Sequence, residues 1–226
     1  MTKVTAISGG STPISSDTYI HIILDETGSM GSSKAATISS FNEFISTQKK
    51  QEGKCNVSLT TFSASSYISP SVNAVRDIFV NKDLNSVSDL TNETYKPDGM
   101  TNLYDSIGST IAKVENLGVL NPLIVIITDG HDNMSKEYNQ QSIKDIISKK
   151  TADGWTFVYL GANQDAWSVG QSLGLSKGQT MTYSTSNMDN MMSTLSSATM
   201  SYRSIRSAGV VGSVKSFFDE GDENGK

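Results

Sequence analysis

The sequence predicts an α/β protein in which a mostly parallel central sheet carries helices on both faces. Two observations lead to this prediction. Nearly continuous apolar segments of strand length alternate along the chain with segments whose apolar residues recur every three or four positions. Several of the apolar segments end in loops that contain Gly and Asp. Parallel strands that are buried on both faces have this composition, and helices form their connections.

The elements can be assigned in order along the chain. Residues 19–25 are a run of apolar and β-branched residues, which predicts a buried strand. In residues 32–50 the apolar residues repeat with helical spacing, which predicts an amphipathic helix. Further strands are expected at 56–63, 75–80, 121–130 and 155–162, and further helices at 101–118, 142–150 and 163–174. This order indicates a Rossmann-like sheet, whose ligand sites lie beyond the carboxyl ends of the strands.

The chain is expected to divide into four parts. Residues 1–18, rich in Ser, Thr and Gly, predict a flexible arm, and residues 19–185 form the α/β domain. Residues 186–218 predict an amphipathic helical extension, and residues 219–226 an acidic, disordered tail. The extension has an apolar stripe that either packs on the domain or docks a partner. Its members are Met188, Met191, Met192, Leu195, Tyr202 and Ile205.

Composition limits the classes of partner. The formal net charge is -5, from 18 Lys and Arg against 23 Asp and Glu, which argues against nucleic acid as the partner. No apolar segment approaches the ~20 residues that span a bilayer, so no membrane insertion is expected. The first 17 residues lack the apolar core of a secretion signal, and the single cysteine, Cys55, cannot form an intramolecular disulfide. A cytoplasmic protein with a buried Cys55 is therefore expected.

The segment 22–31, "IILDETGSMG", places oxygen-bearing side chains at every second position after a strand. Asp25, Thr27 and Ser29 lie on one short loop. Oxygen ligands that converge from one loop are the ligands that a small, hard cation prefers. This loop therefore predicts one part of a metal site.

Two other expected loops supply further oxygen ligands. In "PDGMTNLYDSI" Thr101 stands where a helix begins, and in "IVIITDGHDN" Asp129 ends a buried strand. The three loops together offer two carboxylates and three hydroxyls. The C-terminal ends of the strands are therefore the predicted place of the metal site.

These three motifs resemble those of the von Willebrand factor A (vWA) family and its metal-ion-dependent adhesion site (MIDAS), over roughly residues 19–175. The first loop is similar to the family's D-x-S-x-S element, with Thr27 in the first serine position. The "GMTNLYD" stretch is similar to the glycine-x-threonine-x-leucine element, and "ITDG" to the strand-end aspartate. The resemblance implies five metal ligands: Asp25, Thr27, Ser29, Thr101 and Asp129.

The resemblance also implies a function in recognition and not in catalysis. The cation would be Mg²⁺, with Mn²⁺ or Ca²⁺ as alternatives, and a protein partner would supply an Asp or Glu carboxylate to it. Short proteins similar to this family serve as adaptors for MoxR-type AAA+ ATPases, which is one alternative. Another is a self-assembling structural protein, in which an acidic segment of one copy binds the metal of another.

Enzyme classes fit the sequence less well. A haloacid-dehalogenase-type phosphotransferase needs a second Asp where Thr27 stands, and the nucleophile elbow G-x-S-x-G needs a Gly at that same position. His21 lies within a strand, and His131 beside Asp129 is expected to be a rim residue, because imidazole suits zinc better than a hard cation.

Three acidic residues adjoin the predicted ligands, namely Glu26, Asp98 and Asp132. They are either solvated loop charges or groups that support the ligands through hydrogen bonds. The sequence leaves both interpretations open.

Overall fold

The structure is a computed structural model that describes residues 17–64, 73–163 and 165–218. Its centre is a six-stranded sheet of order β3-β2-β1-β4-β5-β6. All neighbouring strands are parallel except β2 and β3, which are antiparallel. The strands are β1 Thr18–Asp25, β2 Cys55–Ala64, β3 Asn73–Asp83, β4 Leu123–Thr128, β5 Thr156–Ala162 and β6 Thr180–Tyr183.

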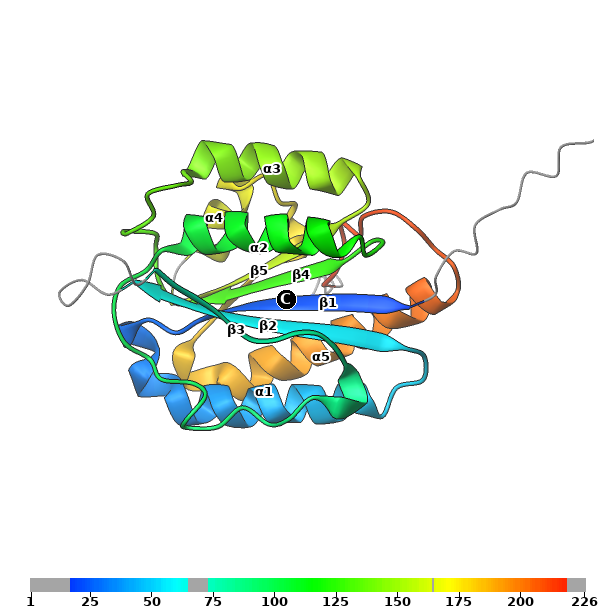
Figure 1. Cartoon of the computed structure of the whole chain (residues 1–226), viewed down its shortest axis with the longest axis horizontal. Helices are drawn as coiled ribbons and strands as arrows, with labels where there is room; N and C mark the ends of the chain where they lie inside the picture. The colour runs from blue at the N-terminus through cyan, green and yellow to red at the C-terminus, as the bar shows by residue number, and fades with distance from the viewer. Residues whose placement is uncertain (1–16, 65–72, 164, 219–226) are drawn as a thin grey trace, which may run out of the picture.

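Helices cover both faces of the sheet (Figure 1), which confirms the predicted fold class. Helices α2, α3 and α4 lie on one face, and α1 and α5 lie on the other. The α-helices are α1 Lys34–Lys49, α2 Leu103–Leu117, α3 Gln140–Ala152, α4 Ala166–Ser172 and α5 Met188–Ser207. Short 3₁₀ turns are Gly28–Ser33, Leu84–Ser86, Lys177–Gln179 and Thr185–Asn187.

The central strands have the burial that their composition predicts. Every residue of β1, β4 and β5 is buried, because helices pack on both faces of these strands. Strand β6 was not expected from the sequence, since its four residues are too few to show a periodic pattern. Strand β3 is longer than the expected 75–80 and runs antiparallel.

Strand β3 lies at one edge of the sheet and is irregular. Its pairing with β2 shifts register on either side of Leu59, and Asn81 has a positive φ of 47°. The strand also carries four charged residues: Arg76, Asp77, Lys82 and Asp83. A bulge and charges are typical of an exposed edge strand.

Helix α5 packs on the sheet and on α1. Five residues of its predicted apolar stripe are buried, whereas Ile205 is 36 % exposed. The buried Arg203 donates hydrogen bonds to the backbone carbonyls of Gln48 (2.6 Å), in the last turn of α1, and Gly53 (3.1 Å), in the loop that follows. These bonds join α5 to the C-terminal end of α1 and to the loop after it. Residues 1–16 of the expected arm and residues 219–226 of the expected tail lie outside the described residues.

Two smaller expectations can be compared with the structure. Cys55 is buried, as predicted, and burial raises the pKa of its thiol to about 11, so the thiol stays protonated at neutral pH. In the described part of the chain, no helix combines the length and the apolar character needed to cross a membrane.

A buried chain of hydrogen bonds joins β1, β2 and β3 beneath α2. His21 contacts the Tyr19 hydroxyl through Nδ1 (3.1 Å) and the Thr60 hydroxyl through Nε2 (2.7 Å). Thr60 donates onward to Asp77 Oδ1 (2.7 Å), so the Thr60 oxygen is free to accept the Nε2 proton. This arrangement fits a neutral imidazole. Burial is the main cause that lowers the pKa of His21 to about 3.

We expect Leu195→Ala in α5 to lower the free energy of unfolding by about 2–5 kcal/mol, because the substitution removes a fully buried side chain and leaves a cavity. Leu120→Ala is the matched control, since Leu120 is 60 % exposed. Urea denaturation measures both. Equal stability of the two variants would show that α5 does not belong to the core.

We also expect His21 to make the protein less stable at acidic pH. Between pH 6.5 and about 3 the unfolded histidine binds a proton that the folded one excludes, so the free energy of unfolding decreases as the pH falls. The contribution is about 1.4 kcal/mol per pH unit. Urea denaturation from pH 6.5 to 4 should show a shallower pH dependence for His21→Gln than for the wild type.

Replacement of the other histidine is the control for this experiment. His131 is exposed, and His131→Gln should keep the pH dependence of the wild type. The assignment to His21 is wrong if the His21→Gln variant also keeps it.

Candidate metal centre

The carboxylate of Asp25 ends β1 and is completely buried. Its Oδ1 accepts the Thr27 backbone N–H (2.8 Å), and its Oδ2 accepts the Thr128 hydroxyl (2.5 Å). Leu24 pairs with Ile127 in the sheet, so Asp25 and Thr128 end neighbouring strands at the same level. Burial raises the pKa of Asp25 to about 6, and the hydrogen bonds from Thr128 and Thr27 oppose this rise.

Hydroxyl groups connect the first loop to the end of β4. The Thr27 and Ser29 side-chain oxygens lie 3.1 Å apart. Ser29 donates a hydrogen bond of 2.6 Å to Asp129 Oδ1, across 100 residues of sequence. The structure therefore brings together the first-loop residues and the strand-end aspartate that the sequence predicted as ligands.

Thr101 reaches the same place from the loop before α2. A Cβ added at Gly130, beside Asp129, would lie 3.0 Å from the Thr101 hydroxyl. The Thr101 loop is held by Gly99, whose φ is +79° and where a Cβ would lie 2.5 Å from the Ala64 carbonyl oxygen. Only glycine fits there. All five predicted ligands thus gather at the carboxyl ends of β1 and β4.

The acidic neighbours of these residues differ in their surroundings. Glu26 is buried, and both its oxygens accept hydrogen bonds from the Arg76 guanidinium (2.8 Å each). Glu26 also accepts the Lys96 backbone N–H, so it ties β3 and the loop before Thr101 to the end of β1. Asp98 is exposed and accepts the backbone N–H of Gly99. Glu26 is therefore a structural tie, whereas Asp98 is a solvated loop residue.

Sequence reasoning missed three polar residues at or near the site. Thr128 donates a hydrogen bond to the Asp25 carboxylate. Its position just before Asp129 in "ITDG" is the sequence feature that could have indicated this contact. The Asn102 side chain, next to Thr101, is buried, and its amide atoms have no hydrogen-bond partner among the described residues. The Tyr183 hydroxyl is likewise buried without a hydrogen-bond partner among the described residues. Burial, together with the charges of Asp129 and Asp25, raises the pKa of Tyr183. No signal pointed to Tyr183, because β6 was not recognised.

The donor set suits a hard cation. Within 17–64, 73–163 and 165–218, no three or more His, Cys, Asp or Glu side chains are grouped so that they could hold a metal. The site instead offers two carboxylates and three hydroxyls. Oxygen donors of this kind fit Mg²⁺, Ca²⁺ or Mn²⁺ better than a softer metal. His131 is exposed.

A comparison with known protein families identifies the family of this chain. Residues 20–198 match the von Willebrand factor type A domain. The chain belongs to this family. A comparison with curated protein sequences gave no significant match. The match of residues 20–198 confirms the predicted resemblance to the vWA family, which generally contains metal-dependent protein-interaction modules.

Solved structures with the same fold come from diverse proteins. Proximal thread matrix protein 1 from the mussel byssus, with a zinc-occupied MIDAS motif, has a TM-score of 0.58 and 14% identity, over 81% of this chain and 46% of that chain. The pilus adhesin SpaC from Lactobacillus rhamnosus GG has a TM-score of 0.61 and 13% identity, over 82% and 30%. Manganese-loaded Plasmodium vivax TRAP has a TM-score of 0.51 and 13% identity, over 79% and 73%. The vWA chain described here spans less than half the length of the first two.

We expect Asp129→Asn to abolish or strongly weaken Mn²⁺ binding without unfolding the protein, because the substitution removes one of two carboxylate charges from the site. Asp98→Asn is the matched control, since it removes an exposed loop charge beside the site. Calorimetric titration with MnCl₂ measures the affinity, and circular dichroism checks the fold. Unchanged Mn²⁺ affinity in Asp129→Asn would rule out Asp129 as a ligand.

Proposed function

We propose that this protein recognises another protein through a divalent cation held by Asp25, Thr27, Ser29, Thr101 and Asp129. The observation that carries the proposal is the hydrogen bond from Ser29 to Asp129, which joins the first loop to the end of β4. Membership of the vWA family supports the same conclusion. Mg²⁺ is the proposed cation, with Mn²⁺ or Ca²⁺ as alternatives.

The chain's own residues explain why such a site would bind a carboxylate. Asp25 and Asp129 supply the negative charge, whereas the hydroxyls of Thr27, Ser29 and Thr101 are neutral. A bound cation would keep electrophilic character here and would accept an Asp or Glu carboxylate from a partner. Asp25 is already hydrogen bonded through both oxygens, which fixes its orientation.

The surrounding loops would add selectivity. Coordination of one carboxylate is a single bond, so the contacts of loops 27–33, 97–102 and 130–134 must distinguish one partner from another.

The site has no proposed catalytic role. The neutral His21 is buried in the hydrogen-bond chain beneath α2, where it contacts Tyr19 and Thr60.

Two kinds of partner fit this proposal. One is a different protein, such as an AAA+ ATPase that the domain would serve as an adaptor. The other is a second copy of the chain, which would assemble through the same metal. The mass of the purified protein with Mg²⁺ and with EDTA separates them, because only self-assembly makes the mass depend on the metal in the absence of other proteins.

We expect capture of the partner to require both the cation and the ligands. Immobilised wild-type protein in Mg²⁺ should retain the partner, whereas EDTA, Asp25→Ala or Thr101→Ala should abolish or strongly reduce retention. Thr194→Ala is the matched control, since Thr194 is exposed on α5. Quantitative mass spectrometry of the retained proteins measures the effect.

The partner's side of the contact can be tested in the same assay. Replacing the contacting Asp or Glu of the partner by its amide should reduce binding as much as EDTA does. A partner that binds equally in EDTA, or equally to Thr101→Ala, would show that the domain recognises it through another surface.

A further inference from the structure

Hydrogen bonds join the β4–α3 loop to the first turn of α2, and each of the two segments donates to the other. The Tyr104 N–H donates to Asp132 Oδ1 (3.2 Å), and the Asp105 N–H donates to the Ser135 hydroxyl (3.0 Å). Ser135 in turn donates to Asp132 Oδ1 (2.5 Å). These loop side chains cap the N-terminus of α2, whereas the side chain of the N-cap residue, Asn102, makes no such bond.

The carboxylate of Asp105, on the helix, accepts hydrogen bonds from the backbone of the loop. Asp105 is buried and accepts three consecutive backbone N–H groups, from Lys136 (2.9 Å), Glu137 (2.9 Å) and Tyr138 (2.8 Å). Hydrogen bonds to a charged acceptor are stronger than those between neutral groups. Asp105 therefore fixes the course of the loop at residues 136–138.

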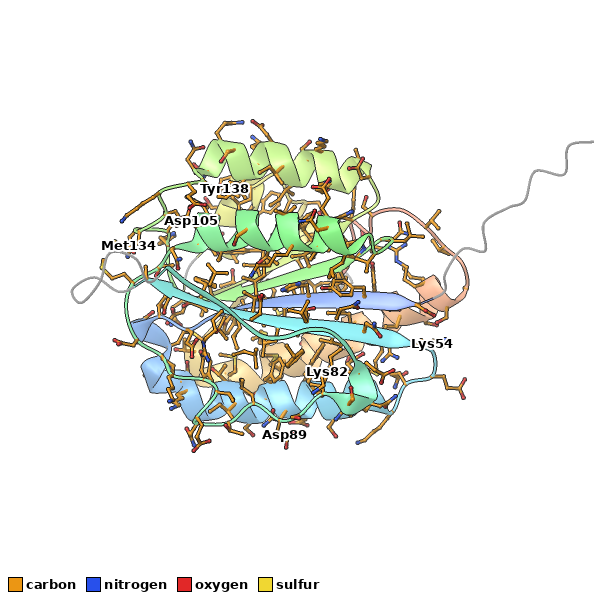
Figure 2. All side chains as sticks on the ribbon, in the orientation of Figure 1. Lys54, Lys82, Asp89, Asp105, Met134 and Tyr138 are labelled. Carbon is orange, nitrogen blue, oxygen red and sulfur yellow. The ribbon has the colours of Figure 1, made fainter. Side chains whose placement is uncertain are left out.

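The Tyr138 ring adds a second point of contact one turn along α2. A Cβ added at Gly108 would lie 2.6 Å from this ring, so the ring packs directly on the glycine backbone. Figure 2 shows Asp105, Met134 and Tyr138 at the same end of the molecule, near the start of α2 and far from Lys54. The loop is thus held at two successive levels of the helix.

The same loop joins two of the proposed ligands. The N–H groups of Asn133 and Met134 both donate to the Thr101 carbonyl (2.9 Å each), and the Thr101 N–H donates to Asn133 Oδ1 (2.9 Å). Thr101 precedes α2, whereas Asp129 follows β4. The contact between the loop and α2 therefore helps to set the separation of Thr101 and Asp129.

We propose that Asp105 is a positioning residue of the metal site, an inference that rests on the proposed function. Its carboxylate holds residues 136–138 against α2, and the loop then holds Thr101 opposite Asp129 and Gly130. A purely structural tie would change stability alone. A positioning residue also changes the affinity for the cation, because loss of the tie lets the ligands move apart.

The test compares Mn²⁺ affinity, by calorimetry, in the wild type, Asp105→Asn and Ser135→Ala. Asparagine has a single acceptor oxygen, and its amide NH₂ would face a backbone N–H, so the tie is weakened at nearly constant volume. We expect about a tenfold or greater loss of Mn²⁺ affinity in Asp105→Asn and a smaller loss in Ser135→Ala. Hydrogen exchange at the amides of residues 136–138 should become faster in Asp105→Asn.

Two controls separate positioning from general effects. Glu137→Gln removes a carboxylate charge from an exposed side chain of the same loop and should keep wild-type affinity. Leu195→Ala destabilises the protein on the opposite face of the sheet and should also keep it. Equal loss of Mn²⁺ affinity in Leu195→Ala and Asp105→Asn would overturn the inference.

The remaining outcomes are also decisive. If Asp105→Asn exchanges faster at residues 136–138 but binds Mn²⁺ like the wild type, Asp105 is only a structural tie and the inference is wrong. If Asp105→Asn does not fold, Ser135→Ala decides, and unchanged affinity in that variant contradicts the inference. A wild type that binds no Mn²⁺ contradicts the proposed function, and this inference falls with it.

Discussion

The buried carboxylate of Asp25 is the constraint on which the arrangement of the site depends. A polar group without solvent contact must be satisfied by hydrogen bonds from the protein, and a carboxylate most of all. Thr128 on β4 and the Thr27 N–H supply them, and the Tyr95 hydroxyl donates to the Asp25 carbonyl (2.7 Å). Satisfying Asp25 therefore fixes the end of β4, the turn toward Ser29 and the loop before α2 at once.

The chemistry of the site follows from how little charge the fold places there. Desolvation alone makes an ionised Asp25 costly, which is why its pKa rises to about 6. A cation beside the carboxylate would favour the ionised form again. Asp25 and Asp129 balance a divalent charge only formally, because the remaining donors are neutral hydroxyls, and under the proposed function a cation would keep affinity for a partner's carboxylate.

How far the sequence predicts the structure depends on how far apart in the sequence the contacting residues lie. Strands β1, β4 and β5 could be predicted because burial on both faces leaves long apolar runs. The grouping of the candidate ligands could be predicted because two short motifs end strands and a third begins a helix. The roles of Glu26 and Asp105 could not. Glu26 meets Arg76 50 residues away, and Asp105 meets Lys136 31 residues away, so no local pattern marks either contact. Strand β6 was missed because four residues carry too little periodicity.

The two edges of the sheet have a consequence for how any partner can attach. An exposed strand offers unpaired backbone groups that another strand can extend, unless irregular backbone, charge or short length prevents it. Strand β3 combines a shifted register with four charged residues, and β6 is only four residues long. Both edges are poor templates for another strand. Growth of the sheet from molecule to molecule by added strands is therefore disfavoured.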